Sequence, residues 1–260
     1  MTGEIFVFDP YPQGKVRVVL LHGLGADYEM WQLQFAALHT EGLRPLALDV
    51  PGFGRSKFSL PVWRVKTVVQ QMADWAERAQ MVPCVVVGIS MGGVLAQEWA
   101  LDFPQQVRAL VLVNTFARLR PHSLGVWWYF LRRAVAVRLL GPQAQAELVA
   151  RRVFPHPQQQ ELRQQVVQKI VGVDRRVYQQ VMRELLWFDA LPRLAELKMP
   201  TLVLSGLEDQ TVPLELQRQM AKQIRFAQQV EVPDAGHGMP VDSAPVFNRL
   251  LVDFLRSVPL

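Results

Sequence analysis

The stretch Val85-Val86-Val87-Gly88-Ile89-Ser90-Met91-Gly92-Gly93 decides the fold of this chain. A β-branched run passes through Gly-x-Ser-x-Gly into the helix-favouring run Val94 to Ala100, which predicts a strand, a sharp turn and a helix. Gly88 and Gly92 lack the Cβ atoms that would press on the neighbouring strand or helix at such a turn. Ser90 stands at the apex, where its hydroxyl is held clear of the backbone as a candidate nucleophile.

Length and composition bound the class of protein. The 260 residues are 50% apolar and 20% charged, and they include a single cysteine, Cys84. This length suits one α/β domain with an insertion, and the composition excludes a disordered chain. One cysteine excludes an internal disulfide and a cysteine metal site, so we expect Cys84 to be a small buried residue.

The sequence also predicts a location. Residues Met1 to Phe6 lack a basic region followed by a long apolar run, so no secretory signal is expected. The apolar window Val126 to Leu140 is interrupted by three arginines and is unsuited to crossing a bilayer. We therefore expect a cytoplasmic protein with no transmembrane segment.

Apolar strands alternate with amphipathic helices on both sides of one helical segment. This alternation predicts an α/β fold: a three-layer, doubly wound, mostly parallel sheet with helices on both faces. Residues 115–190 lack buried strands and have the pattern of arginine-rich amphipathic helices, which predicts an α-helical cap (lid) inserted in the core. We expect residues 1–114 and 191–260 to form the core domain and residues 115–190 to form the cap.

Two further polar residues follow later strands of the predicted sheet. Asp209 comes after the strand that ends at Ser205-Gly206, and His237 comes after the last strand. Ligands bind at the carboxyl ends of the strands in such sheets, so these two side chains are candidates to act with Ser90. A serine needs a base to take its proton and a group to hold that base.

Other residues compete for these roles. Glu208 is adjacent to Asp209, and Asp234 lies near His237, although its position favours a turn former or a helix cap. We expect Asp49 to be a structural acceptor that ties the loop after its strand. The remaining histidines fit the role of base less well. His39 lies on a predicted helix, and the insertion contains two more, His122 and His156.

Five landmarks give the sequence its resemblance to the α/β-hydrolase family, over almost the whole chain. They are His22-Gly23, Asp49-x-Pro51-Gly52-x-Gly54-x-Ser56, the turn at Ser90, and the loops of Asp209 and His237. The family has its catalytic triad in the order Ser, Asp, His on a sheet of this kind. A serine at the nucleophile position separates the chain from epoxide hydrolases and haloalkane dehalogenases of this fold, which have an aspartate there.

The resemblance implies a mechanism that needs no cofactor and no metal. His237 would deprotonate Ser90, Asp209 would orient the imidazole, and an acyl-enzyme would form and then be hydrolysed. The backbone N–H groups of Leu24 and Met91 would form the oxyanion hole. His22 would brace the loop that carries Leu24.

The same resemblance implies that the cap covers the active site and shapes the substrate pocket. Aromatic residues near both ends of the insertion are candidates for an apolar wall over Ser90: Trp127, Trp128, Phe130 and Trp187. An alternative is that these aromatics only hold the cap on the core.

The net charge of +5 arises in the insertion. Residues 115–190 contain twelve Lys and Arg against five Asp and Glu. These arginines could steer an anionic substrate, an acidic carrier protein or an anionic membrane surface. Carrier-protein ester hydrolases of this fold, such as the pimeloyl carrier-protein methyl ester esterases, use a basic cap in that way. The alternative is a solvated face whose arginine stems cover apolar surface. No nucleic-acid-binding motif accompanies the charge, so no nucleic-acid partner is expected.

The sequence therefore predicts a serine esterase, a carboxylic-ester hydrolase acting on a small-molecule ester through an acyl-enzyme on Ser90. Two alternatives remain open at this stage. The first is a carbon–carbon bond hydrolase or enol-lactonase of aromatic degradation with the same triad. The second is a non-catalytic ligand receptor that keeps the hydrolase fold.

Overall fold

The computed structural model describes residues 4–119, 128 and 141–259. Within these residues, seven strands form one sheet in the order β1-β3-β2-β4-β5-β6-β7. β1 pairs antiparallel with β3, and every other neighbouring pair is parallel. This mostly parallel sheet confirms the predicted fold class. The strands span Val7–Phe8 (β1), Val16–Leu21 (β2), Leu43–Leu48 (β3), Cys84–Ile89 (β4), Val107–Val113 (β5), Thr201–Gly206 (β6) and Ala227–Val232 (β7).

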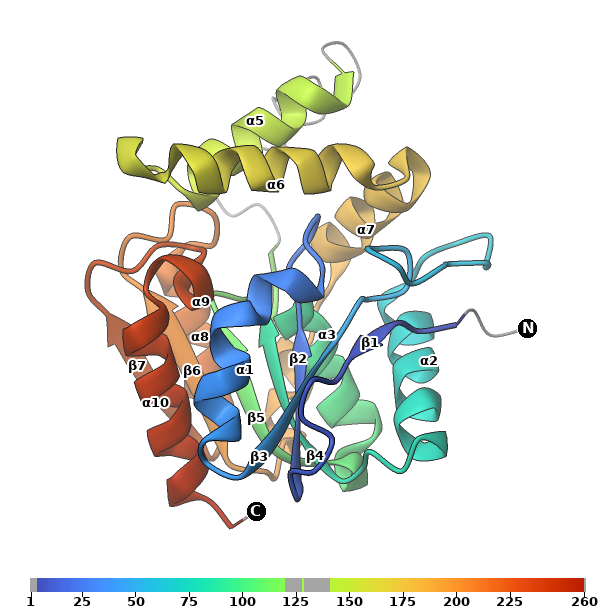
Figure 1. Cartoon of the computed structure of the whole chain (residues 1–260), viewed down its shortest axis with the longest axis vertical. Helices are drawn as coiled ribbons and strands as arrows, with labels where there is room; N and C mark the ends of the chain where they lie inside the picture. The colour runs from blue at the N-terminus through green and yellow to red at the C-terminus, as the bar shows by residue number, and fades with distance from the viewer. Residues whose placement is uncertain (1–3, 120–127, 129–140, 260) are drawn as a thin grey trace.

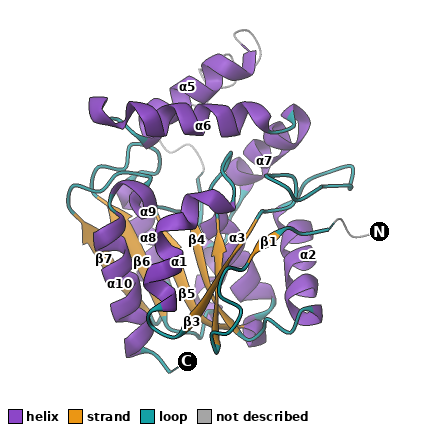
Figure 2. Ribbon diagram, in the orientation of Figure 1, coloured by secondary structure: helices purple, strands orange, loops and turns teal. Residues whose placement is uncertain are grey.

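Helices cover both faces of the sheet, and an apolar core lies on each face (Figure 2). One core packs α2, α3 and α8 against the strands, and the other packs α1 and α10. These helices span Gln32–His39 (α1), Val65–Arg78 (α2), Met91–Asp102 (α3), Leu214–Gln223 (α8) and Ala244–Ser257 (α10), with the short α9 at Met239–Asp242. Within the described part of the chain, no helix combines the length and the apolar character that crossing a membrane requires.

Three further helices lie beyond the carboxyl ends of the strands (Figure 1). They are α5 (Gly141–Val153), α6 (Gln160–Gly172) and α7 (Arg175–Trp187). They share a small apolar cluster of their own around Ile170 and Tyr178, and α7 also buries Val181 in the core beneath it. These three helices fall within residues 115–190, while the insertion as a cap and its division from the core at residues 115 and 190 stay predictions.

The order of the strands positions the site. From β2 the chain moves to β3 on one side, and then it crosses back to β4 on the other side of β2. Such a reversal opens a crevice at the carboxyl ends of the two strands involved. The loop that begins at His22 follows β2, and Ser90 follows β4, so the topology brings these two landmarks to one crevice.

The second helix begins later than the sequence predicts. Periodicity predicts a helix from about residue 60 to 81, but α2 begins at Val65. The Trp63 N–H donates to Gln180 Oε1 at 2.7 Å, and Gln180 Nε2 donates to the Pro61 carbonyl at 3.1 Å. Gln180 lies on α7. Its side chain therefore occupies the Trp63 N–H and the Pro61 carbonyl, which would otherwise belong to the first turn of the helix.

Candidate active site

Ser90 is the single residue between β4 and α3. Its backbone angles, φ 53° and ψ −116°, lie in a region that costs a residue with a side chain on the order of 1–3 kcal/mol. The Ser90 N–H donates to the Val113 carbonyl at 3.0 Å, and the Thr115 hydroxyl donates to the Ser90 carbonyl at 2.7 Å. The end of β5 therefore holds the turn in a conformation that projects the serine hydroxyl.

The glycines of the turn are required by close packing. A Cβ on Gly88 would collide with the backbone of Gly92, and a Cβ on Gly92 would collide with the Leu21 carbonyl. The strand, the turn and the neighbouring β2 thus approach at backbone distance, as the Gly-x-Ser-x-Gly pattern predicts.

Asp209 and His237 are joined in a buried pair. His237 Nδ1 lies 2.9 Å from Asp209 Oδ2, and their side chains are 8% and 1% exposed. The other carboxylate oxygen, Oδ1, accepts the N–H groups of Thr211 at 2.7 Å and Val212 at 3.0 Å. A carboxylate only accepts hydrogen bonds, so the proton of a neutral His237 lies on Nδ1 and leaves Nε2 as an acceptor.

The two rivals of Asp209 lie elsewhere. Glu208 Oε2 is 2.7 Å from His156 Nε2, on the segment that links α5 to α6. Asp234 is exposed and has φ 55°, which fits the predicted turn former. The structure brings Asp209, and neither rival, to His237.

Asn114 is a functional residue that sequence reasoning missed. Its side chain is fully buried at the end of β5. Nδ2 donates to the carbonyls of Gly236 at 2.8 Å and His237 at 3.0 Å, and Oδ1 accepts the Gly206 N–H at 2.8 Å. One amide thus joins the loop of the histidine to the strand that precedes the aspartate. The only signal in the sequence is a polar residue directly after an apolar strand.

His22 is fully buried and braces the loop after β2. Its Nε2 accepts the Val50 N–H at 2.9 Å, and its Nδ1 donates to the Gly23 carbonyl at 2.8 Å. This pairing requires the neutral ring, and burial lowers the pKa of His22 accordingly. The loops after β2 and β3 are therefore fixed to each other through one imidazole.

Asp49 ties two loops together, as expected from its place after β3. Oδ1 accepts the Tyr28 N–H at 2.8 Å, and Oδ2 accepts the Arg55 N–H at 2.7 Å. Gly54 has φ 53°, and a Cβ there would overlap the carboxylate of Asp49. Both carboxylate oxygens of Asp49 thus hold loops in place, and Asp49 is not part of the Asp209–His237 pair.

The two predicted oxyanion donors belong to different elements, the start of α3 and the loop after β2. Met91 is the first residue of α3, where backbone N–H groups have no partner within the helix, and its side chain is fully buried in the core. Leu24 lines the same cavity as Ser90, on the loop that His22 braces. This placement agrees with the expected pair of N–H groups, and their role in catalysis stays a proposal.

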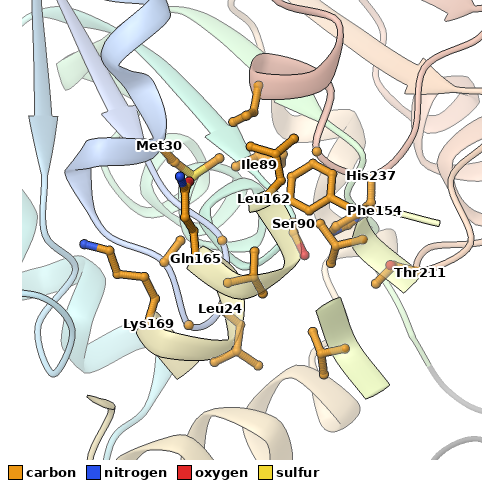
Figure 3. Close-up of a pocket in the computed structure, with 18 of the residues that line it drawn as sticks. Leu24, Met30, Ile89, Ser90, Phe154, Leu162, Gln165, Lys169, Thr211 and His237 are labelled. Carbon is orange, nitrogen blue, oxygen red and sulfur yellow. The ribbon is translucent and has the colours of Figure 1, made fainter. Parts of the chain in front are cut away.

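A cavity of about 710 Å³ contains both Ser90 and His237 (Figure 3). The core contributes Gly23, Leu24 and Ile89 to its wall. The helices above the sheet contribute mostly apolar side chains: Val149, Val153, Phe154, Leu162, Val166, Met182 and Leu185. A ligand over Ser90 would therefore lie between the core and α5 to α7, in largely apolar surroundings.

The aromatic residues predicted for the pocket wall are not found there among the described residues. Trp128 is 62% exposed and Trp187 is 67% exposed, and neither lines the cavity. Trp127 and Phe130 lie outside the described residues. α7 buries positions 178, 181 and 185, so Trp187, two residues after the last of them, points to the opposite side of the helix.

The last turn of α5 and the segment after it are attached to the loops of the acid and the base. Arg152 Nη1 donates to the Gln210 carbonyl at 3.2 Å, and His156 contacts Glu208 as described above. Gln159 Nε2 donates at 3.4 Å to Oδ2 of Asp242, which lies four residues after Gly238. Burial raises the pKa of Asp242.

In the described part of the chain, neither metal binding nor thiol chemistry has a suitable group. Residues 4–119, 128 and 141–259 contain no group of three or more His, Cys, Asp or Glu that could hold a metal ion. Cys84 is fully buried at the start of β4, and burial raises the pKa of its thiol to about 12. It is an unreactive core residue, as its position predicts.

Residues 18–249 match the sequence profile of the Alpha/beta hydrolase family, and the chain belongs to that family. A protein of Variovorax paradoxus (strain S110), whose name gives it as a carbamate hydrolase, RutD, is 30% identical over 256 residues. The match covers 95% of this chain and 94% of the relative. The chain is thus a hydrolase by family.

Two solved structures are similar over nearly their whole length. The enol-lactonase from Burkholderia xenovorans LB400 is 27% identical with a TM-score of 0.85, covering 98% of this chain and 97% of that one. A thermophilic esterase from Thermogutta terrifontis is 28% identical with a TM-score of 0.84, covering 98% and 94%. The fold and the general class of enzyme agree with the resemblance found in the sequence.

Proposed function

We propose that this protein is a serine esterase that cleaves carboxylic esters, with Ser90 as nucleophile, His237 as base and Asp209 as the acid that orients it. The observation that carries the proposal is the buried His237–Asp209 pair at 2.9 Å, which opens on the same cavity as a serine held at φ 53°. These are the parts that acyl transfer from an ester to a serine requires.

The chemistry follows from the geometry. His237 Nε2 takes the Ser90 proton as Oγ attacks the ester carbonyl, and Asp209 stabilises the imidazolium that forms. The N–H groups of Leu24 and Met91 stabilise the charge on the carbonyl oxygen. The C–O bond breaks, the leaving alcohol takes the proton from His237, and a water activated by the same histidine releases the acid.

The cavity supports a small to medium acyl ester with apolar character. Its volume of about 710 Å³ and its apolar wall favour a substrate with a hydrocarbon or aromatic portion. We propose that residues 115–190 form the cap that selects this portion. The name of the RutD relative gives a carbamate as its substrate; the nitrogen of a carbamate makes its carbonyl less electrophilic than that of an ester, so we expect slower turnover of carbamates.

An ester panel combined with covalent labelling tests the proposal. A fluorophosphonate should label Ser90 in the folded protein, and Ser90→Ala and His237→Ala should abolish labelling. Nitrophenyl esters of graded acyl length should show an optimum at medium length, with carbamates turned over more slowly. If a folded protein is not labelled, the ligand receptor on this fold becomes the better reading and the esterase is rejected.

An enol-lactonase is the second candidate, because one similar solved structure is an enol-lactonase. The same serine would attack a lactone carbonyl, and the ring C–O bond would break. An enol-lactone and a dienone, the substrate of carbon–carbon bond hydrolases, are therefore added to the panel. A kcat/KM for either that exceeds every ester by more than about ten-fold would overturn the ester assignment while retaining Ser90 as nucleophile.

The basic cap adds a secondary proposal, an anionic substrate or an acidic carrier protein. Part of this charge is used within the chain. Arg118 pairs with Asp189 at 2.7 Å, and Arg163 donates to the carbonyls of His156 and Pro157. Other arginines of α5 and α7, such as Arg151 and Arg183, are exposed and available to a partner.

A further inference from the structure

The oxyanion loop, residues 23–29, is held from above by a cap helix. Lys169 of α6 forms a hydrogen-bonded ion pair with the Asp27 carboxylate, and its Nζ lies 2.6 Å from Glu29 Oε2. The three side chains are 37%, 11% and 42% exposed in the order Lys169, Asp27, Glu29. The Lys169–Asp27 ion pair is therefore more shielded from water than the Lys169–Glu29 pair, and solvent weakens it less.

A second contact joins the same two elements. Gly25, one residue after Leu24, has φ 77°, and a Cβ at this position would overlap the side chain of Ile170. Ile170 is the residue next to Lys169 and is buried. Consecutive residues of α6 thus contact the loop at two places, Ile170 at Gly25 and Lys169 at Asp27.

The charges of Asp27 and Lys169 also act on His22, which lies at the base of the loop. After burial, which dominates, the pKa of His22 is raised by Asp49 and Asp27 and lowered by Lys169. Asp27, Glu29 and Lys169 line the same cavity as Leu24 and Ser90 and together have a net charge of −1, so removal of the ammonium would leave −2 in the wall of the cavity where the oxyanion would form. A negative charge at that place opposes the transition state, because oxyanion stabilisation is electrostatic.

We propose that Lys169 is a positioning residue for acyl transfer, which neutralises Asp27 and fixes the loop that presents the Leu24 N–H to the substrate carbonyl oxygen. The inference rests on the proposed esterase mechanism. It makes α6 part of the catalytic apparatus, in addition to its place in the pocket wall. Lys169 acts through Asp27 and the loop, and it transfers no proton.

Substitution of Lys169 provides the first test. Lys169→Met keeps the aliphatic stem and removes the charge, and it should lower kcat about ten-fold while KM changes less than about two-fold, because the affected group acts on the transition state. Lys169→Arg should restore most of kcat. Lys222→Met, the same change at an exposed lysine of α8, should leave kcat unchanged. A Lys169→Met enzyme with kcat within about two-fold of wild type overturns the inference.

A double-mutant cycle tests whether the effect passes through Asp27. Asp27→Asn keeps an oxygen that can accept the Glu29 N–H but removes the carboxylate charge. In that background, Lys169→Met should cost less than about two-fold; an equal ten-fold loss in both backgrounds would reject the route through Asp27. Should Lys169→Met fail to fold, Lys169→Gln serves in its place, because it also removes the ammonium charge, and it should lower kcat about ten-fold at nearly constant KM.

Fluorophosphonate labelling separates the two levels of failure. A wild-type protein that is labelled and active, with Lys169→Met equal to it, rejects this inference alone. A folded wild-type protein without labelling rejects the proposed function and this inference with it.

Discussion

The core half and the cap half of the site are built by different means. In the core half, the end of β5 fixes Ser90, the buried Asn114 fixes the His237 loop, and the buried His22 fixes the loop after β2, all through hydrogen bonds to the backbone. The cap half consists of side chains from α5, α6 and α7, attached by ion pairs and hydrogen bonds that are partly exposed. The difference teaches that the sheet holds the proposed reacting groups rigidly, whereas the helices above it supply much of the cavity wall through contacts that are easier to change.

Removal of the proposed nucleophile or base should have the largest effect. Ser90→Ala and His237→Ala are expected to lower kcat by about 10⁴-fold or more, because neither residue functions without the other. Thermal unfolding should show both variants folded. Residual ester turnover within ten-fold of wild type in either variant would mean that other residues catalyse the reaction. The contrast between the core half and the cap half would then no longer hold.

Asn114 should have the largest effect on stability. Asn114→Leu is similar in size but leaves two buried carbonyls and one N–H without partners, each at a cost of about 1–3 kcal/mol. We expect a loss of about 3–5 kcal/mol in the free energy of unfolding, measured with urea, together with a lower kcat. Gln143→Leu on α5, which removes one exposed hydrogen bond, should cost less than about 0.5 kcal/mol.

The core half could be predicted from the sequence because its signals are local. Gly-x-Ser-x-Gly between a strand and a helix leaves the backbone one conformation, and parallel strands bring their carboxyl ends to one edge. The residues that follow the strands therefore pointed to the Asp209–His237 pair and to the cavity that Ser90 and His237 share, while the catalytic roles of the three stay a proposal. Asn114 escaped, because nothing local shows that one amide will bond to residues 122 and 123 positions away.

The cap half could not be predicted in the same way. Its helices were expected, but an amphipathic pattern does not say which side chains will face a cavity formed by another part of the chain. Aromatic bulk favoured Trp187, yet the helical spacing of the buried face of α7 directs it to solvent. Phe154 lines the cavity instead, beside Gly238, where a Cβ would overlap its ring.

A pair of cap substitutions sharpens this point. Phe154→Ala enlarges the pocket, so we expect the preferred acyl chain to lengthen and kcat/KM for short esters to fall about ten-fold. Trp187→Ala, an exposed aromatic of the same cap, should leave the preference unchanged. The ester panel measures both. Equal shifts in the two variants would mean that the cap affects acyl preference through its general stability, and that Phe154 has no specific role in the pocket wall.

Acidic pH should weaken the core half through His22. The pKa of His22 is lowered from 6.5 in the fold, so the unfolded chain holds the proton more tightly. This contribution to stability is fully present above about pH 6.5 and is lost as the pH falls through the folded-state pKa. His22→Gln cannot titrate. Its free energy of unfolding, measured with urea at pH 5 to 8, should therefore have a shallower slope against pH than that of the wild-type protein. Identical slopes for both proteins would mean that His22 is not the group responsible.

The smallest expected effect concerns the exposed arginines of the cap. If Arg151 and Arg183 steer an anionic ester, kcat/KM for an ester with a distal carboxylate should fall about two- to five-fold as salt rises from about 0.05 to 0.5 M, because exposed charges are screened. A neutral ester of equal length should show no change, and replacement of both arginines by glutamine should remove the difference. A flat response for both esters would mean that these side chains form a solvated face with no part in substrate binding. The selectivity of the cap would then rest on the shape of the cavity alone.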